Sequence, residues 1–439
     1  MRRREGSGLI SMWGEHIRRR IVIRTFISLV ILGSFIVLCS LRNRKVCAAQ
    51  DESFPYRVWP SEPPAGCPFQ KSSEITGIAF TGRHIRYANA DTWYPSWAAN
   101  GNMYSPWTDG KVGAVSSSSY GKKATTGYAT ILGDDPFHLE FTNVGVYPGD
   151  PAPYEGRYPC GSLVYNGVWY YGTYCLLDSD HDPGKGLNWD ILGPFVGFRY
   201  SLDYGKTWHD TPHTPANTLF GEPASPGGVV KIGSPHFVDF GRNMRYSPDG
   251  KAYLVGQGAT DPDPLPRPAN LSWITGDQIY MARVKPGIQN MNNRAKYEFF
   301  AGYDAGQHPI WTRDFTRIKP LVDWNNNCGC VTMTYDAPLK KFLMCITDGG
   351  NTISKFNTYI LESGHVDGPW KLVVYMHEFG EQAYFVNIPS KFISADGRTA
   401  WLCYAANFSN GNPNWNTHHR PNPPGGGYGM TLQEIKLLP

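Results

Sequence analysis

The sequence has little net charge and little helical pattern, and these two absences exclude several classes of protein. Only 18% of the 439 residues are charged, and the formal net charge is +4. Much of that excess lies in an N-terminal cluster of arginines, so the rest of the chain is near neutral. A near-neutral domain offers no electrostatic footprint for a phosphate backbone, and we expect no nucleic-acid partner. The apolar period of an amphipathic helix is nearly absent, which argues against a helix bundle.

The cysteines also lack the spacing of a metal-binding site. Cys328 and Cys330 are separated by one residue, and no second pair of ligands stands at the spacing of a zinc site. Beyond the N-terminal segment the cysteines are Cys67, Cys160, Cys175, Cys328, Cys330, Cys345 and Cys403. This odd number leaves at least one thiol unpaired, and we expect structural cysteines that are disulfide-bonded or buried.

The chain has one long apolar run, from Phe26 to Leu41, and arginines precede it. The run is typical of the hydrophobic part of a signal peptide or of a short membrane anchor. Arg42, Arg44 and Lys45 follow the run, so both cleavage and retention stay open. We assign residues 1–50 to a signal peptide or signal anchor, 51–73 to a Pro-rich linker and 74–439 to the main domain. We therefore expect an extracytoplasmic protein, secreted or anchored, that touches the membrane only through its N-terminal segment.

The main domain is rich in turn residues and aromatic side chains. With 48 glycines, 35 prolines and 14% aromatics, the composition favours short strands joined by tight turns. One hairpin pattern occurs five times: two strands joined by a turn that contains Gly, Asp, Asn or Pro. The five copies span residues 91–109, 158–174, 234–257, 331–347 and 385–404. Four of them carry an Asn-Gly or Asp-Gly pair, which supplies the positive φ that a tight hairpin requires.

Further strand-like segments lie between the copies, at residues 197–208, 278–284 and 359–375. Each unit can thus be completed to about four strands, the size of a propeller blade. We predict an all-β, five-bladed β-propeller, with residues 427–437 supplying the strand that closes the ring. A pair of β-sandwiches is the main structural alternative.

Ser201, Asp203, Gly205, Thr207 and Trp208 fit the Asp-box pattern S/T-x-D-x-G-x-T-W. This turn resembles the one found in sialidases and other propellers. It is typical of a propeller hairpin and indicates little about chemistry.

The innermost strands of a propeller line a central funnel, so polar residues that enter those strands are the candidates for a site. On this basis we predict Asp91, Glu155 and Glu381 as catalytic acids. The candidate substrate-binding residues are Trp93, Trp97, Trp107, His236 and Arg317. The tryptophans could stack on sugar faces, and His236 and Arg317 could bind hydroxyls or tune a carboxylate.

The residues from Ala90 to Trp93, followed by a hairpin that ends in Trp107-Thr108-Asp109-Gly110, resemble the first blade of glycoside hydrolase family 43 arabinanases. Residues 74–437 also resemble a domain-of-unknown-function family that includes bacterial endo-D-arabinanases, particularly at 368–370, 390–392 and 395–399. These resemblances imply a five-bladed glycosidase in which Asp91 is the general base. Glu381 or Glu155 would then be the acid, and Asp109, which precedes a glycine, is expected to serve the turn.

We therefore predict a glycoside hydrolase that acts on an arabinan-like or other neutral polysaccharide through paired carboxyl groups. A non-catalytic propeller that binds glycans or a protein partner is the alternative. A sialidase ranks lower, because the required set of three arginines and a tyrosine nucleophile cannot be assembled.

No cofactor is required by this hypothesis. Asp178, Asp180 and Asp182 imitate the first half of a Ca²⁺-binding loop, with Gly184 at the expected turn position. Asp190 stands where the loop pattern has glutamate, so Ca²⁺ is a possible ligand there.

Overall fold

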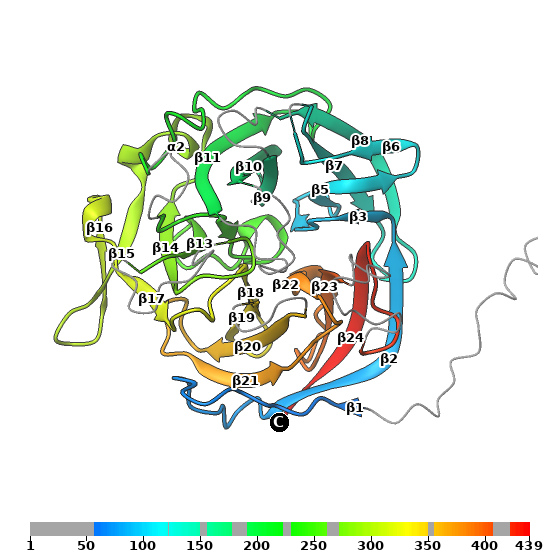
Figure 1. The fold of residues 1–439 in the computed structure, drawn as a ribbon, viewed down its shortest axis with the longest axis vertical. Helices are drawn as coiled ribbons and strands as arrows, with labels where there is room; N and C mark the ends of the chain where they lie inside the picture. The colour runs from blue at the N-terminus through cyan, green and yellow to red at the C-terminus, as the bar shows by residue number, and fades with distance from the viewer. Residues whose placement is uncertain are drawn as a thin grey trace, which may run out of the picture. The chain divides into compact units, whose positions relative to one another are not determined.

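The computed structural model describes residues 57–121, 123–149, 156–177, 191–222, 230–260, 272–349, 355–406 and 422–439. These residues belong to one compact unit that spans residues 56–439. The unit is nearly all β and consists of five antiparallel sheets arranged around a central axis, which is a five-bladed β-propeller (Figure 1). The predicted fold class is confirmed.

The blades follow one another along the chain, and each sheet is numbered here in that order. Blade one contains β3 (Asn89–Asp91), β4 (Ser96–Trp97), β5 (Met103–Val112), β6 (Val115–Ser117), β7 (Thr125–Leu132) and β8 (Glu140–Pro148). Blade two contains β9 (Gly156–Tyr165), β10 (Val168–Leu177) and β11 (Ile191–Ser201). Blade three contains β12 (His236–Phe237), β13 (Ala252–Gly258), β14 (Gln278–Val284), β15 (Glu298–Tyr303), β16 (Pro309–Thr312) and β17 (Pro320–Asp323). Blade four contains β18 (Val331–Asp336), β19 (Lys341–Asp348), β20 (Asn357–Ser363) and β21 (Lys371–Met376).

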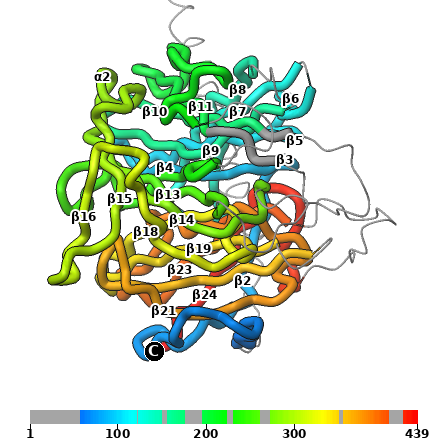
Figure 2. The backbone as a smooth tube through the Cα atoms, turned by 60° about the vertical axis from the view of Figure 1, so that its left-hand side comes forward, coloured from blue at the N-terminus to red at the C-terminus, as the bar shows by residue number. Residues whose placement is uncertain are grey.

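Blade five is built from both ends of the described chain. Its strands, from the axis outward, are β22 (Tyr384–Asn387), β23 (Thr399–Ala405), β24 (Met430–Leu438), β2 (Gly77–Tyr87) and β1 (Arg57–Val58). β2 pairs with β24 from Gly77 opposite Leu438 to Tyr87 opposite Met430. Figures 1 and 2 both show the first described strands beside the C-terminus. The predicted closing strand is confirmed.

The helical content is limited to short connections. They are α2 (Ile288–Met291), η2 (Arg242–Met244), η3 (Arg294–Lys296), η4 (Phe315–Arg317) and η5 (Ser390–Phe392). Within the described ranges, no helix has the length and apolar character needed to cross a membrane. The N-terminal segment predicted from the sequence lies outside the described residues.

The five predicted hairpins are the inner strand pairs of the five blades. The tightest turn joins β9 to β10, where Asn166 and Gly167 have φ of 48° and 83°. Positive φ at both central positions matches the right-handed twist of the strands, and asparagine and glycine tolerate it. The local turn chemistry thus explains why the hairpins can be read from the sequence.

Residues 57–73, which the sequence predicts as part of a linker, pack on the propeller. Trp59 is buried against Phe80 and Phe379. The Ser72 hydroxyl donates to Glu362 of β20 over 2.8 Å. This segment is therefore part of the folded domain and covers the outer strands of blades four and five.

The turn from Ser201 to Trp208 is held by its own side chains. Asp203 accepts hydrogen bonds from the backbone amides of Lys206 and Thr207 and from the Thr207 hydroxyl. Trp208 packs against Trp169, with ring centroids 5.0 Å apart. The turn lies at the outer edge of blade two, away from the axis.

Of the seven cysteines of the described residues, every one except Cys67 is buried. The sequence predicted cysteines that are either disulfide-bonded or buried, and burial is what the structure shows for these six.

Candidate functional site

A cavity of about 120 Å³ lies on the propeller axis, where the inner strands of several blades begin. We call it the axial cavity. Its lining comes from blade one (Asp91, Thr92, Asp109), blade two (Tyr158, Tyr174), the segment before β14 (Trp273), blade five (Tyr384, Phe385) and the segment before β24 (Tyr428). Two carboxyl groups thus face a cavity whose other walls are largely aromatic.

Strand pairing brings the two carboxyl groups together. Asp91 ends β3 and lies opposite Thr108 of β5, so it is a cross-strand neighbour of Asp109. Three non-glycine residues of the cavity, Thr92, Asp109 and Phe385, have positive φ of 65°, 47° and 55°. Such a conformation is unfavourable for a β-branched residue such as Thr92, and strained backbone persists where the surroundings enforce it, which happens often at functional sites.

The Asp91 carboxyl is held from two sides. The Tyr384 hydroxyl donates to its Oδ2 over 2.8 Å, and the Thr92 hydroxyl donates to its Oδ1 over 2.8 Å. Burial raises the pKa of Asp91 well above its ordinary value, and the nearby Asp109 carboxylate raises it further. The hydrogen bonds act in the opposite direction but do not outweigh burial, so this carboxyl retains a proton more readily than a surface aspartic acid.

Asp109 is held by a single partner, Ser119. The Ser119 backbone amide donates to Oδ1 over 2.7 Å, and the Ser119 hydroxyl donates to Oδ2 over 2.6 Å. Burial raises the pKa of Asp109, whereas the two bonds from Ser119 lower it. Because two like charges in one cavity disfavour each other, the pair holds one proton more easily than none. We place that proton on Asp91 and the negative charge on Asp109.

Four tyrosines line the cavity, and the hydroxyls of three of them can be placed. Tyr428 donates its hydroxyl to the main-chain carbonyl of Asp109, and Tyr384 bonds Asp91 as described. The Tyr174 hydroxyl is buried and has no hydrogen-bond partner among the described residues. It therefore faces the cavity as an unused donor and acceptor for a ligand hydroxyl.

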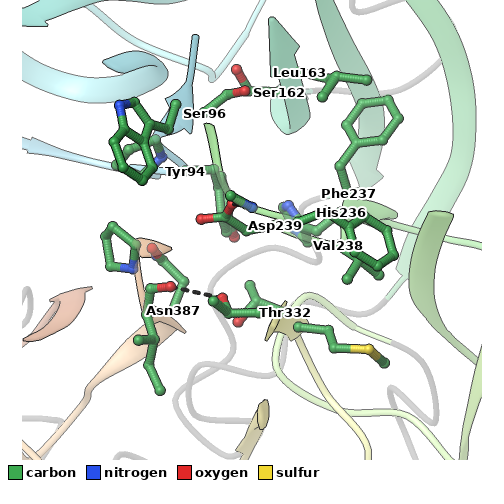
Figure 3. A pocket seen from close by; sticks show the side chains of 18 of the residues that line it. Tyr94, Ser96, Ser162, Leu163, His236, Phe237, Val238, Asp239, Thr332 and Asn387 are labelled. Atoms are coloured by element: carbon green, nitrogen blue, oxygen red, sulfur yellow. Dashed lines mark hydrogen bonds between the residues drawn. The ribbon is translucent and has the colours of Figure 1, made fainter. Parts of the chain in front are cut away.

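A second, smaller cavity of about 50 Å³ lies further along the axis, and we call it the channel cavity. Figure 3 shows Ser162, His236, Thr332 and Asn387, which come from the inner strands of different blades, and Tyr94, which comes from the segment between β3 and β4. The His236 ring packs against Tyr94 in a tilted arrangement, with centroids 3.7 Å apart. Neither ring nitrogen has a hydrogen-bond partner in the described structure, and burial lowers the pKa of His236 to about 3. This histidine is therefore neutral at ordinary pH.

The tryptophans expected to bind sugar lie elsewhere. Trp93 and Trp107 are fully buried in blade one and stack on each other, with centroids 6.4 Å apart. They cannot stack on a ligand in this position, because both side chains are almost completely inaccessible. Trp97 lines the channel cavity, and Trp273 is the tryptophan that lines the axial cavity.

The other predicted site residues are not brought to the axial cavity. Glu381 is buried and pairs with Lys355, with Oε2 3.5 Å from Nζ. Arg317 is exposed on η4, between the outer strands of blade three. Glu155 and the predicted Ca²⁺ ligands Asp178, Asp180 and Asp182 lie outside the described residues. Within the part of the chain that is described, no three His, Cys, Asp or Glu side chains are grouped as a metal site requires.

Asp91, a predicted site residue, lines the axial cavity, and Asp109, which was not predicted as a site residue, lines it too. Asp109 precedes Gly110, and this order led us to expect a turn role, although the residue lies on β5 with its carboxyl in the cavity. Tyr384 and Tyr428 were also missed, because they are nearly 300 residues or more from Asp91 along the chain and no local pattern marks them.

No protein-family model matches the chain, and no curated protein matches it either. Among solved structures, an α-L-arabinofuranosidase from Podospora anserina matches 87% of this chain and 96% of its own, at 13% identity and a TM-score of 0.40. A family 117 glycoside hydrolase from Zobellia galactanivorans matches 81% and 89%, at 12% identity and a TM-score of 0.43. An exo-1,5-α-L-arabinanase from a bovine ruminal metagenomic library matches 80% and 94%, at 14% identity and a TM-score of 0.38. At this level of similarity the argument for function rests on the site itself.

Proposed function

We propose that the protein is a glycoside hydrolase whose reaction takes place in the axial cavity. The observation that carries the proposal is the pair Asp91 and Asp109, two neighbouring carboxyl groups, the first buried and the second half-buried, in a cavity lined by aromatic side chains. Glycoside hydrolysis requires two carboxyl groups in different protonation states, and the environment of this pair favours such a split.

In this proposal Asp91 is the proton donor. Its buried, protonated carboxyl transfers a proton to the leaving oxygen as the glycosidic C–O bond breaks. The Asp109 carboxylate, held by Ser119, stabilises the positive charge that develops at the anomeric carbon. Water then adds to that carbon, and its proton returns to Asp91. This assignment replaces the base role that the family resemblance implies for Asp91.

The cavity wall supports a sugar as the ligand. Trp273 and the tyrosines offer flat faces for the apolar side of a ring and hydroxyls for its polar edge. The cavity is small, with a volume of about 120 Å³, so we propose that no more than a single residue of a polysaccharide enters it.

The test is the release of oligosaccharides or monosaccharides from a panel of arabinans, xylans and fructans. Asp91→Asn and Asp109→Asn should each lower kcat by about 10²–10⁴, the usual contribution of a positioned acid or base. Asp396→Asn is the matched control, because Asp396 is an exposed residue of an Asp-Gly turn in blade five. If no glycan of the panel is cleaved by the wild-type protein, the catalytic proposal is withdrawn in favour of glycan binding without catalysis.

A further inference from the structure

A third cavity, of about 630 Å³, lies between blades one and two, and we call it the interblade cleft. Strands β7 and β8 form one wall, and β9, β10, β11 and the segment after β11 form the other. Its principal polar side chains are Thr126, Tyr147, Arg157, Thr173, Arg199 and His213. The cleft differs from the axial cavity in carrying two arginines.

The interblade cleft is close to the carboxyl pair. Arg157 and Tyr158 are consecutive in β9, so their side chains point to opposite faces of the strand. Tyr158 lines the axial cavity and Arg157 lines the cleft. The backbone amide of Arg157 also donates to the carbonyl of Ser119 over 2.9 Å, and Ser119 is the residue that holds Asp109. One strand of blade two thus separates the two spaces.

Arg199 is a buried cation that meets aromatic faces. The side chain is only 5% exposed, and its guanidinium carbon lies 3.9 Å from the Tyr171 ring centroid and 4.4 Å from that of Tyr147. Its Nη2 donates to the Thr126 hydroxyl over 2.5 Å. Its Nε has no hydrogen-bond partner among the described residues, and no described carboxylate forms an ion pair with it. A buried charge is costly unless an opposite charge or a full set of hydrogen bonds compensates it.

A second arginine, Arg157, lines the cleft beside Arg199. Arg157 is also buried, and its Nε donates to the Thr173 hydroxyl over 3.1 Å. Burial lowers the pKa of Arg199, and the charge of Arg157 lowers it further. Asp210 is the one carboxylate among the described lining residues, and the Tyr147 hydroxyl donates to it over 2.5 Å. Among the described residues that line the cleft, Arg199 therefore lies near one acid, and that acid already accepts a hydrogen bond from Tyr147.

We infer that the interblade cleft is a subsite for an oxyanion substituent, a carboxylate or a sulfate or phosphate ester, on the glycan whose neighbouring sugar enters the axial cavity. Guanidinium groups bind such oxygens through paired N–H bonds, and aromatic packing holds the Arg199 fork in place. The reference to a glycan rests on the proposed function, whereas the binding of the anion itself does not.

The experiment compares four ligands by isothermal titration calorimetry: glucose, glucuronate, glucose 6-sulfate and glucose 6-phosphate. At least one of the three anions should bind tenfold more tightly than glucose, and the tightest of them identifies the substituent. Arg199→Met, which keeps the side-chain length but removes the charge, should weaken that binding at least tenfold. Arg283→Met is the matched control: Arg283 lies 3.8 Å from the Trp311 ring centroid but is paired with Glu298 over 2.7 Å. It should leave anion binding unchanged.

Equal binding of the four ligands by the wild-type protein, or wild-type affinity in a folded Arg199→Met variant, would overturn the inference. Should Arg199→Met fail to fold, as judged by circular dichroism, Thr214→Glu carries the test. Thr214 is exposed and lines the cleft, so a carboxylate there must weaken anion binding at least threefold, and unchanged affinity overturns the inference. Titrations on Asp91→Asn separate the two proposals. If the wild-type protein cleaves no glycan but binds an anion through Arg199, the proposed hydrolase activity is contradicted and the anion subsite is supported.

Discussion

The neutral imidazole of His236 makes the stability of the propeller depend on pH. The ring is 2% exposed, and burial lowers its pKa from 6.5 to about 3. The unfolded chain therefore binds a proton near pH 6.5, whereas the folded chain does not bind one until about pH 3. The stability contributed by the neutral ring is complete above pH 6.5 and is lost as the pH falls toward 3.

The size of the loss follows from the two pKa values. At pH 5 the unfolded state gains about 2 kcal/mol from protonation at this residue, and the loss approaches about 5 kcal/mol near pH 3. Carboxylates that are paired in the folded state add to the loss at low pH, so the contribution of His236 must be isolated by substitution.

His236→Phe keeps a flat ring against Tyr94 and removes the titrating group. Urea unfolding, followed by tryptophan fluorescence at pH 7.5 and pH 5.0, should show that the variant loses about 2 kcal/mol less than the wild type between the two values. His308→Gln is the control, because the His308 side chain is 80% exposed and should not alter the difference. Equal losses in the wild type and in His236→Phe would refute the reasoning, since they would mean that His236 titrates alike in both states.

Three further predictions follow from other contacts. Tyr384→Phe removes the hydroxyl that is hydrogen-bonded to Asp91, and this loss raises the pKa of Asp91 further. The alkaline limb of the pH–rate profile should therefore move to higher pH. We also expect kcat to fall roughly fivefold, the equivalent of about 1 kcal/mol. Movement of the acidic limb instead would contradict the donor role. Gly127→Ala should lower the free energy of unfolding by about 1–3 kcal/mol in urea titrations, because the new Cβ would lie 2.3 Å from the Trp107 ring; an unchanged midpoint would refute this. A chain that ends before Met430 leaves β2 without its partner, and it should be insoluble or rapidly digested by trypsin under conditions in which the full chain resists.

The fold could be predicted because its signals are local. Pairs such as Asn166-Gly167 fix a hairpin within a few residues, and alternating aromatic and β-branched residues mark the strands on either side. The same reasoning placed the closing strand correctly at Met430–Leu438. The packing of residues 57–73 on the propeller could not be predicted, because a proline-rich composition does not reveal that Trp59 is buried.

The site was harder to predict because it depends on contacts that are distant in sequence. Asp91 could be found from its position at the end of an inner strand. Its partner Asp109 carries the pattern of a turn residue, and only the pairing of β3 with β5 brings it to the same cavity. Trp107 was expected to bind sugar, because aromatic residues do so at surfaces. The Trp107 ring instead packs inside the blade against Gly127, where a residue with a side chain would occupy the same space. Burial of this kind depends on the assembled sheet and cannot be predicted from a short segment of sequence.

The pairing of β2 with β24 also sets the order in which the molecule can assemble. Gly77 and Leu438 are 361 positions apart, and bringing the ends of so long a loop together costs about 5 kcal/mol of chain entropy. The paired strands of blades one to four each come from one stretch of chain, so these sheets can form earlier. The sheet of blade five cannot be completed before the final residues are available. Until then β2 is a strand with an open edge, and such edges recruit other chains. The slow step and the period of greatest aggregation risk should therefore coincide at the closure of the ring.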